Sequence, residues 1–198
     1  MKNTMIRFPL VCLAAALLWS PLLEAQARVG SNAVSVGLGF FGNGGAFLAS
    51  SNNTRSQTLS GLFGLGGDFE HFIQPDTSIG AIFRYYNTSD SLPSGAGTAD
   101  ATETLMTLGG LLKAYLLTTP NWDGYLSTGL GYVAATAKLG TGATVDPSGF
   151  GFYLGFGALY KWNSDIAFGF ENLRMIALGD KINGWPLNDF LLKARFAF

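Results

Sequence analysis

The chain ends in Asp189-Phe-Leu-Leu-Lys-Ala-Arg-Phe-Ala-Phe198, and these ten residues decide the fold. Their apolar side chains recur at every second position, from Phe190 to Phe198. The opposite parity carries three charged residues, Asp189, Lys193 and Arg195. A period of two is the period of a β-strand, because successive side chains of a strand point to opposite faces. The stretch therefore predicts a strand with one wholly apolar face and one charged face.

The composition indicates a chain that does not present its whole surface to water. Charged residues make up 13% and hydrophobic residues 48%, whereas soluble chains carry about 25% charged residues. A helical membrane protein would need about 20 consecutive apolar residues per span, but beyond residue 30 glycine, serine, threonine and asparagine interrupt every apolar run. A single β-barrel domain remains, because lipid requires that every backbone polar group be paired within the protein. The net charge of −1 and the lack of a basic cluster argue against nucleic acid as a partner.

Residues 1–27 have the pattern of a secretory signal peptide. After a short basic segment, residues 8–23 form an apolar run, and Ala25-Gln-Ala27 is a small-x-small cleavage site. We expect cleavage after this site, which leaves residues 28–198 as the barrel domain; the alternative is an N-terminal anchor helix. Cys12 is the only cysteine, so the cleaved chain can form no disulfide.

The remaining chain divides into segments with strand periodicity and connections of alternating length. The predicted strands cover about 32–41, 58–72, 78–87, 103–117, 122–135, 149–162, 166–174 and 189–198. The long connections are 42–56, 88–101, 140–148 and 177–188, and the short ones are 74–77, 118–121 and 163–165. An even number of strands with short turns at one end and long loops at the other is the pattern of outer-membrane barrels.

The strand count, the rhythm of the loops and the terminal strand together resemble the small eight-stranded bacterial outer-membrane β-barrels, such as the OmpA transmembrane domain, OmpX and OmpW. The resemblance implies an all-β, eight-stranded antiparallel up-and-down transmembrane β-barrel, exported to the bacterial outer membrane and surrounded by lipopolysaccharide and phospholipid. It also implies that Phe196 and Phe198 belong to a signal that the barrel-assembly machinery reads. The alternative, a secreted lipocalin-like barrel, would need a polar outer face and an apolar interior, but the second face here is mostly glycine with few charges.

Aromatic residues near the strand ends predict the two interfacial girdles of a membrane barrel. The predicted girdle residues are Trp122, Tyr160 and Trp162 at the periplasmic end, and Tyr85, Tyr86 and Tyr132 at the outer end.

Two glycine pairs, Gly66-Gly67 and Gly109-Gly110, are candidate β-bulges. A bulge would shift the facing of the residues that follow it. Without such a shift, Leu111 faces the lumen and Leu112 faces lipid.

The motifs that resemble a cofactor-binding or catalytic site lack the structural context that such a site needs. Gly37-Leu-Gly39-Phe-Phe-Gly42 has the dinucleotide-binding spacing, but a loop follows it where that site needs a helix. His71, the only histidine, would have to serve a hydrolase like the lipid A deacylase barrels. Its expected place is the lipid-facing side of the periplasmic rim, with no nucleophile beside it. We therefore predict no catalytic residue, no metal site and no cofactor.

Charged residues on the inward parity are more informative. The acidic ones are Asp68, Glu70, Glu171 and Asp189, and the basic ones are Arg84, Lys113, Lys193 and Arg195. Eight strands leave an interior just wide enough for side chains, and buried charges are costly unless they are paired. We expect these eight residues to form one connected network; the alternative is a gated polar path, for which the inward glycines would leave room.

The sequence thus predicts a non-catalytic outer-membrane barrel with a plugged polar lumen, acting in envelope integrity or in surface interaction through its outer loops. The alternative is a narrow OmpW-like channel for small or apolar solutes. An apolar lumen or a lateral opening would favour that alternative.

Overall fold

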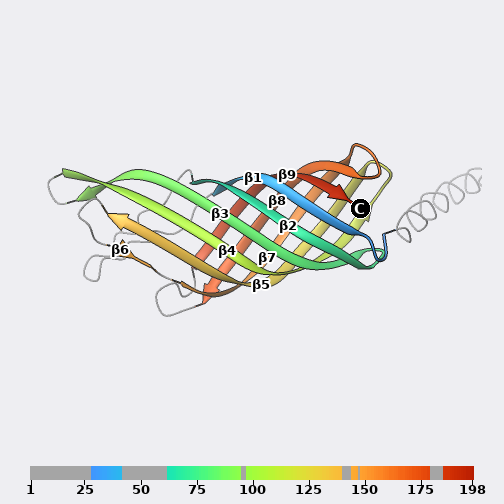
Figure 1. Ribbon diagram of the computed structural model, residues 1–198, viewed down its shortest axis with the longest axis horizontal. Coiled ribbons are helices and arrows are strands. Elements are labelled where there is room, and N and C mark those ends of the chain that lie inside the picture. The colour runs from blue at the N-terminus through green and yellow to red at the C-terminus, as the bar shows by residue number, and fades with distance from the viewer. Residues whose placement is uncertain (1–27, 42–61, 95–96, 140–143, 147, 179–184) are drawn as a thin grey trace, which may run out of the picture.

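The computed structural model describes residues 28–41, 62–94, 97–139, 144–146, 148–178 and 185–198 (Figure 1). The predicted signal peptide, the first long loop and the beginning of the second predicted strand lie outside the described residues. So do 140–143, 147 and 179–184 of the later loops.

Eight long strands close an antiparallel barrel in which every strand pairs with its neighbours in the chain (Figure 1). They are β1 (Asn32–Phe41), β2 (Leu62–Gln74), β3 (Thr77–Ser94), β4 (Gly97–Thr118), β5 (Trp122–Leu139), β7 (Ser148–Lys161), β8 (Ile166–Leu178) and β9 (Trp185–Ala197). A two-residue strand, β6 (Thr144–Val145), pairs only with the end of β5. The first and last strands, β1 and β9, pair with each other and complete the ring. The predicted eight-stranded up-and-down barrel is confirmed.

The described residues contain no helix that is both long and apolar enough to span a bilayer.

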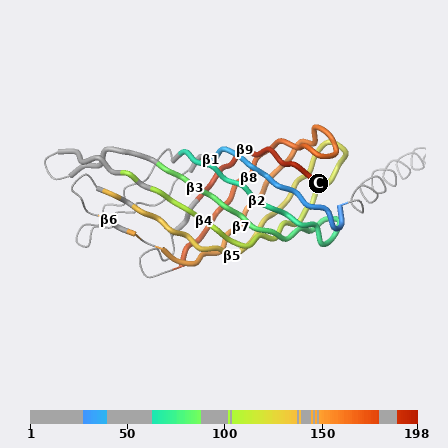
Figure 2. The backbone as a smooth tube through the Cα atoms, in the orientation of Figure 1, coloured from blue at the N-terminus to red at the C-terminus, as the bar shows by residue number. Residues whose placement is uncertain are grey.

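The two ends of the barrel differ in their connections. The short turns after β2, β4 and β7 lie at one end, together with Arg28 and Phe198, and we call this the short-turn end. The opposite end, which we call the loop end, is where β1, β3, β5 and β8 end and where β2, β4, β7 and β9 begin (Figure 2).

The predicted loop 88–101 is largely a β-hairpin. Strands β3 and β4 stay paired as far as Ser94 opposite Gly97, and they project beyond the other strands at the loop end (Figure 1). This segment is rich in serine, threonine and aspartate and has no apolar alternation. Backbone hydrogen bonds hold such a hairpin without an apolar face, so the periodicity could not reveal it.

The glycine pairs are not bulges. The pairing of β2 with β1 runs without a shift through Gly66 and Gly67, and the pairing of β4 with β3 does so through Gly109-Gly110. Register shifts occur instead between Phe72 and Gln74 and between Tyr115 and Leu117, close to the short turns. The inward facing predicted beyond the glycines therefore holds, with Leu111 5% exposed and Leu112 41% exposed.

The outer face carries the aromatic girdles, with one correction. Trp122 packs edge-on against Tyr160, with ring centroids 5.2 Å apart, at the short-turn end. Tyr85 and Tyr132 are exposed nearer the loop end. Tyr86 is not a girdle residue: it is buried inside the barrel because it has the parity opposite to Tyr85.

The lumen is layered, not polar throughout. The layer nearest the loop end is an apolar cluster of Ile82, Tyr86, Leu105, Leu111, Val133, Ala135, Tyr153, Leu173, Met175 and Ala177. A layer of charged residues lies below it, and near the short turns a smaller cluster contains Phe72, Tyr115, Tyr125, Leu159 and Ala167. The lumen therefore holds charged side chains in its middle layer and apolar clusters on either side of that layer.

The terminal Phe198 helps to close the barrel. Its backbone N–H donates to the carbonyl of Asn32, and the N–H of Asn32 donates to the carbonyl of Phe198, both at 2.9 Å. The ring itself is exposed. Phe198 thus contributes a backbone pair to the closure of the barrel and an exposed ring to its surface.

Deletion of Phe198 is expected to lower the folded fraction of the outer-membrane protein, measured by heat-modifiable mobility, more than deletion of Gly142 from a loop. Phe198→Ala separates the two contributions, because it keeps the backbone pair with Asn32 and removes only the ring. If the ring is the assembly signal, Phe198→Ala will assemble as poorly as the deletion. Equal folded fractions for the two deletions would contradict the prediction.

Candidate functional site in the lumen

All eight predicted inward charges are buried, with exposed fractions of 0% to 6%. The period of two places them there, because each has the inward parity of its strand. The structure does not join all eight in one network. Seven of them form what we call the central network: Asp68, Glu70, Arg84, Lys113, Glu171, Asp189 and Lys193.

Two lysines hold three of the carboxylates together. Lys113 Nζ lies 2.8 Å from Asp68 Oδ1 and 2.8 Å from Glu70 Oε1. Lys193 Nζ lies 2.6 Å from Asp68 Oδ2 and 2.9 Å from Glu171 Oε2. These contacts join β2, β4, β8 and β9 across the interior.

Arg84 connects the remaining carboxylate. Its Nη2 lies 2.8 Å from Glu171 Oε1, and its Nε lies 2.9 Å from Asp189 Oδ2. The Nη1 group donates to the backbone carbonyl of Gly67 at 2.9 Å. Gly66 makes room for this side chain, because a Cβ at that position would lie 2.6 Å from Arg84 Cδ.

The central network has four carboxylates but only three cations. Hydroxyl groups supply the additional hydrogen-bond donors that the carboxylates need. The hydroxyl donors are Tyr86 to Asp189, Tyr115 and Ser78 to Glu70, and Tyr125 to Glu171. With them, each oxygen of the four carboxylates accepts at least one hydrogen bond. Full satisfaction of this kind is what makes buried charge tolerable.

These hydroxyl groups were not predicted from the sequence, although their parity could have revealed them. Tyr115 lies two positions beyond Lys113 on the same inward face. Tyr86 lies two positions beyond Arg84, but its place near the predicted strand end suggested a girdle.

Arg195 belongs to a second cluster, which corrects the prediction of a single network. Its Nη1 lies 3.5 Å from Asp123 Oδ2, near the short turns. Asp123 is fully buried and also pairs with Arg28 and Lys161. Asp123 was not predicted from the sequence, although it shares the inward parity of Ser127 on β5.

The geometry offers no catalytic arrangement around His71. Its side chain is half-buried on the outer parity of β2, and Nδ1 lies 2.9 Å from Asn32 Oδ1. In the part of the chain that the structure describes, no group of three or more histidine, cysteine, aspartate or glutamate residues is placed to hold a metal ion. Chemically, the charged side chains of the lumen pair with one another across the interior.

Comparison with known proteins agrees with this architecture. Among solved structures, the Neisserial surface protein A (NspA) has a TM-score of 0.64 at 13% identity, over 84% of this chain and 97% of that chain. Ail of Yersinia pestis, in complex with the heparin analogue sucrose octasulfate, has a TM-score of 0.59 at 12% identity, over 86% and 99%. OprG from Pseudomonas aeruginosa has a TM-score of 0.57 at 15% identity, over 86% and 97%. At these identities the likeness shows the fold.

No curated protein matches the chain in sequence. A family model described as "Outer membrane protein beta-barrel domain" matches residues 11–190. This match covers most of the chain and agrees with the closed antiparallel barrel. The chain therefore belongs to the family of outer membrane protein beta-barrel domains, whose place is the bacterial outer membrane.

Proposed function

We propose that this protein is a non-catalytic outer-membrane barrel whose lumen is plugged, and that it serves envelope integrity or surface interaction through its loop end. The observation that carries the plug is the central network, in which ion pairs from five strands meet in the middle of the barrel. The proposal includes export by the N-terminal signal peptide and assembly by the barrel-assembly machinery into lipopolysaccharide and phospholipid. It includes no metal or cofactor.

An ion can pass through the closed lumen only if several ion pairs separate together. Breaking one buried pair costs about 3–5 kcal/mol. Each 1.36 kcal/mol corresponds to a factor of ten, so an opening that separates one pair would be populated roughly a hundredfold to a few thousandfold less than the closed state. Lys113, Lys193 and Arg84 each pair with two or more carboxylates, which makes opening rarer still.

The role of the loop end is supported by the hairpin of β3 and β4. Its backbone pairing continues to Ser94 and Gly97, which gives a paired projection where an irregular loop was expected. Ail is named an attachment invasion locus protein and NspA a surface protein. We propose that the loop end of this chain likewise meets a partner at the cell surface.

The plug is tested by single-channel recording of the purified barrel in planar bilayers. The expected result is the absence of steady conductance, with only rare, short openings. A steady open conductance from the unaltered protein would contradict the plug and would favour a channel.

The second candidate is a narrow path for small apolar solutes, and one observation favours it. The lumen nearest the loops is lined by apolar residues, among them Leu105, Val133, Leu173 and Met175. An apolar solute could enter this half, but the central network lies below it. Uptake of an apolar fluorophore by proteoliposomes, abolished by Val133→Trp, would support this candidate over the plugged barrel.

A further inference from the structure

One basic residue stands on the lipid-facing side of the barrel wall. Arg174 on β8 has the parity opposite to the buried Glu171, and its side chain is exposed. Of the outward-facing residues between the two girdles in the described strands, it is the only aspartate, glutamate, lysine or arginine. Its register partner on β7 is Leu154, which is exposed to the same apolar surroundings. A charge in such surroundings is rare and marks a functional position.

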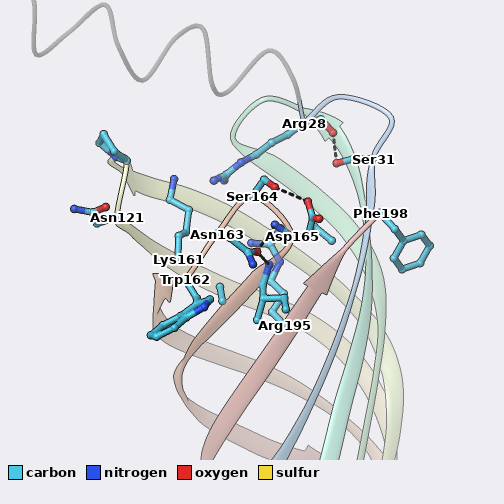
Figure 3. Close-up of a pocket in the computed structure, with 14 residues that line it drawn as sticks. Arg28, Ser31, Asn121, Lys161, Trp162, Asn163, Ser164, Asp165, Arg195 and Phe198 are labelled. Atoms are coloured by element: carbon cyan, nitrogen blue, oxygen red, sulfur yellow. Dashed lines mark hydrogen bonds between the residues drawn. The ribbon is translucent and has the colours of Figure 1, made fainter.

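The height of Arg174 in the membrane follows from the girdle at the short-turn end. Figure 3 shows the Trp162 and Phe198 rings pointing away from the barrel at that end. The N–H of Trp162 donates to the carbonyl of Ile166, the first residue of β8, at 2.9 Å. Arg174 stands eight positions further along β8. At a rise of about 3.3 Å per residue and a tilt of roughly 40°, it lies about 20 Å toward the loop end, in an apolar band about 25 Å tall.

Arg174 therefore lies near the outer edge of the apolar band. In outer-membrane barrels the short turns face the periplasm, so this edge belongs to the leaflet that faces the cell exterior. An arginine on the lipid face costs about 2–4 kcal/mol at the middle of the bilayer but only about 0–1 kcal/mol near the interface. At this height the long side chain reaches the headgroups, while its methylene groups stay in the apolar layer.

The Arg174 guanidinium group has no counter-charge among the described residues, where it forms neither an ion pair nor a hydrogen bond. The nearby carboxylates of Glu171 and Asp189 face the lumen and pair with Arg84. The described outer face between the girdles carries no carboxylate. A second copy packed against this face would therefore bring no acid from its own described outer face, whereas lipid headgroups carry anionic phosphate.

Asn188 adds a second polar side chain at the same place. It is the register partner of Arg174 on β9, it has the same outward parity, and it is half-buried. The Cβ atoms of directly opposed residues lie about 4.5–5.5 Å apart. The amide of asparagine has two N–H donors, so one acceptor group with several oxygens suits both side chains at once.

We propose that Arg174 and Asn188 bind a phosphate group of an outer-leaflet lipid. A phosphate supplies several acceptor oxygens, and arginine recognises it through its planar array of N–H groups. The acyl chains of this lipid lie along Leu154, Phe156 and Phe190, which are exposed on the outer face. The proposal is independent of the plugged lumen, because the site lies on the opposite side of the barrel wall.

The test titrates diphosphoryl lipid A into the purified barrel in a maltoside detergent, followed by native mass spectrometry. Saturable binding of a first lipid is expected for the unaltered protein. Arg174→Gln is expected to weaken it at least about tenfold, as for the loss of a charge-assisted hydrogen bond. Arg174→Lys keeps the charge but loses the planar array, so its affinity should be intermediate. Heat-modifiable mobility verifies that both variants are folded.

Lys138→Gln is the matched control, because it removes the same charge from an exposed lysine beyond Tyr132 on β5. It should bind lipid A like the unaltered protein. Lipid A freed of its phosphates keeps the same acyl chains, and it should bind the unaltered protein at least about tenfold more weakly than the diphosphoryl form. Equal affinities of the unaltered protein and Arg174→Gln for diphosphoryl lipid A would overturn the proposal. So would equal affinities of the unaltered protein for the two lipids.

The same spectra report the oligomeric state of the barrel. A monomer that carries the lipid is expected for the unaltered protein. A dimer that forms without lipid A and is lost in Arg174→Gln would assign this face to a second copy of the chain, and it would overturn the lipid site.

Discussion

Lys113→Met is expected to lower the free energy of unfolding by about 3–5 kcal/mol, the cost of breaking a buried ion pair from one side. Lys113 is fully buried and lies 2.8 Å from both Asp68 and Glu70. Its removal leaves four carboxylates facing two cations, and no hydroxyl group takes its place at Asp68 Oδ1. Methionine keeps most of the side-chain volume, so the loss reports the charge and not a cavity.

The measurement is urea unfolding of the barrel from lipid vesicles. Lys138→Met is the control, because Lys138 is exposed near the loop end, where a substitution changes stability by about 0.5 kcal/mol or less. Equal stabilities for Lys113→Met and Lys138→Met would show that the central network contributes nothing to the fold.

Glu171→Ala is expected to cost less than Lys113→Met, because it leaves three carboxylates facing three cations. It still removes the acceptor of Arg84, Lys193 and Tyr125. Stability should fall, and the frequency of openings in planar bilayers should rise as the plug loosens. A cost above that of Lys113→Met would contradict the account of the central network as rich in acid.

Most of the barrel could be predicted from the sequence, because lipid requires an apolar side chain at every second residue of each strand. The alternation that begins at Phe198 recurs in the other strands, and it placed Asp68, Lys113 and Glu171 inside. The requirement ends where the strands leave the lipid. The sequence of the β3–β4 hairpin beyond that point shows no apolar alternation, so nothing in it predicted the pairing of Ser94 with Gly97.

The ion-pair partners within the lumen could not be predicted from the sequence. The parity of a residue determines whether it faces lipid or the lumen, but not its height, which is its position along the barrel axis. Arg195 has the same parity as Lys193 and lies nearer the short turns, where it meets Asp123. Height depends on the register between strands, and residues far apart in sequence set that register. Arg28 and Asp123 lie 95 positions apart in the chain, yet their side chains are 2.8 Å apart in the structure.

The height of the lipid belt follows from the girdles. Trp122 and Tyr132 are both exposed and stand ten positions apart along β5. At a rise of about 3.3 Å per residue and a tilt of roughly 40°, this span is about 25 Å, the height of the apolar band of an outer-membrane barrel. Leu112 pairs with Thr128, between the two girdles, so it lies near the middle of the belt.

Leu112→Arg is therefore expected to lower the free energy of unfolding by about 2–4 kcal/mol, and Leu116→Arg by only about 0–1 kcal/mol. Both leucines are on the outer face of β4, at 41% and 72% exposure, but Leu116 lies beside the short turn, where an arginine reaches the headgroups. Leu111 is an unsuitable control, because it packs in the apolar half of the lumen and a charge there would be costly for a different reason. Urea titrations from vesicles compare the two variants. Equal costs would place the middle of the membrane nearer to Leu116.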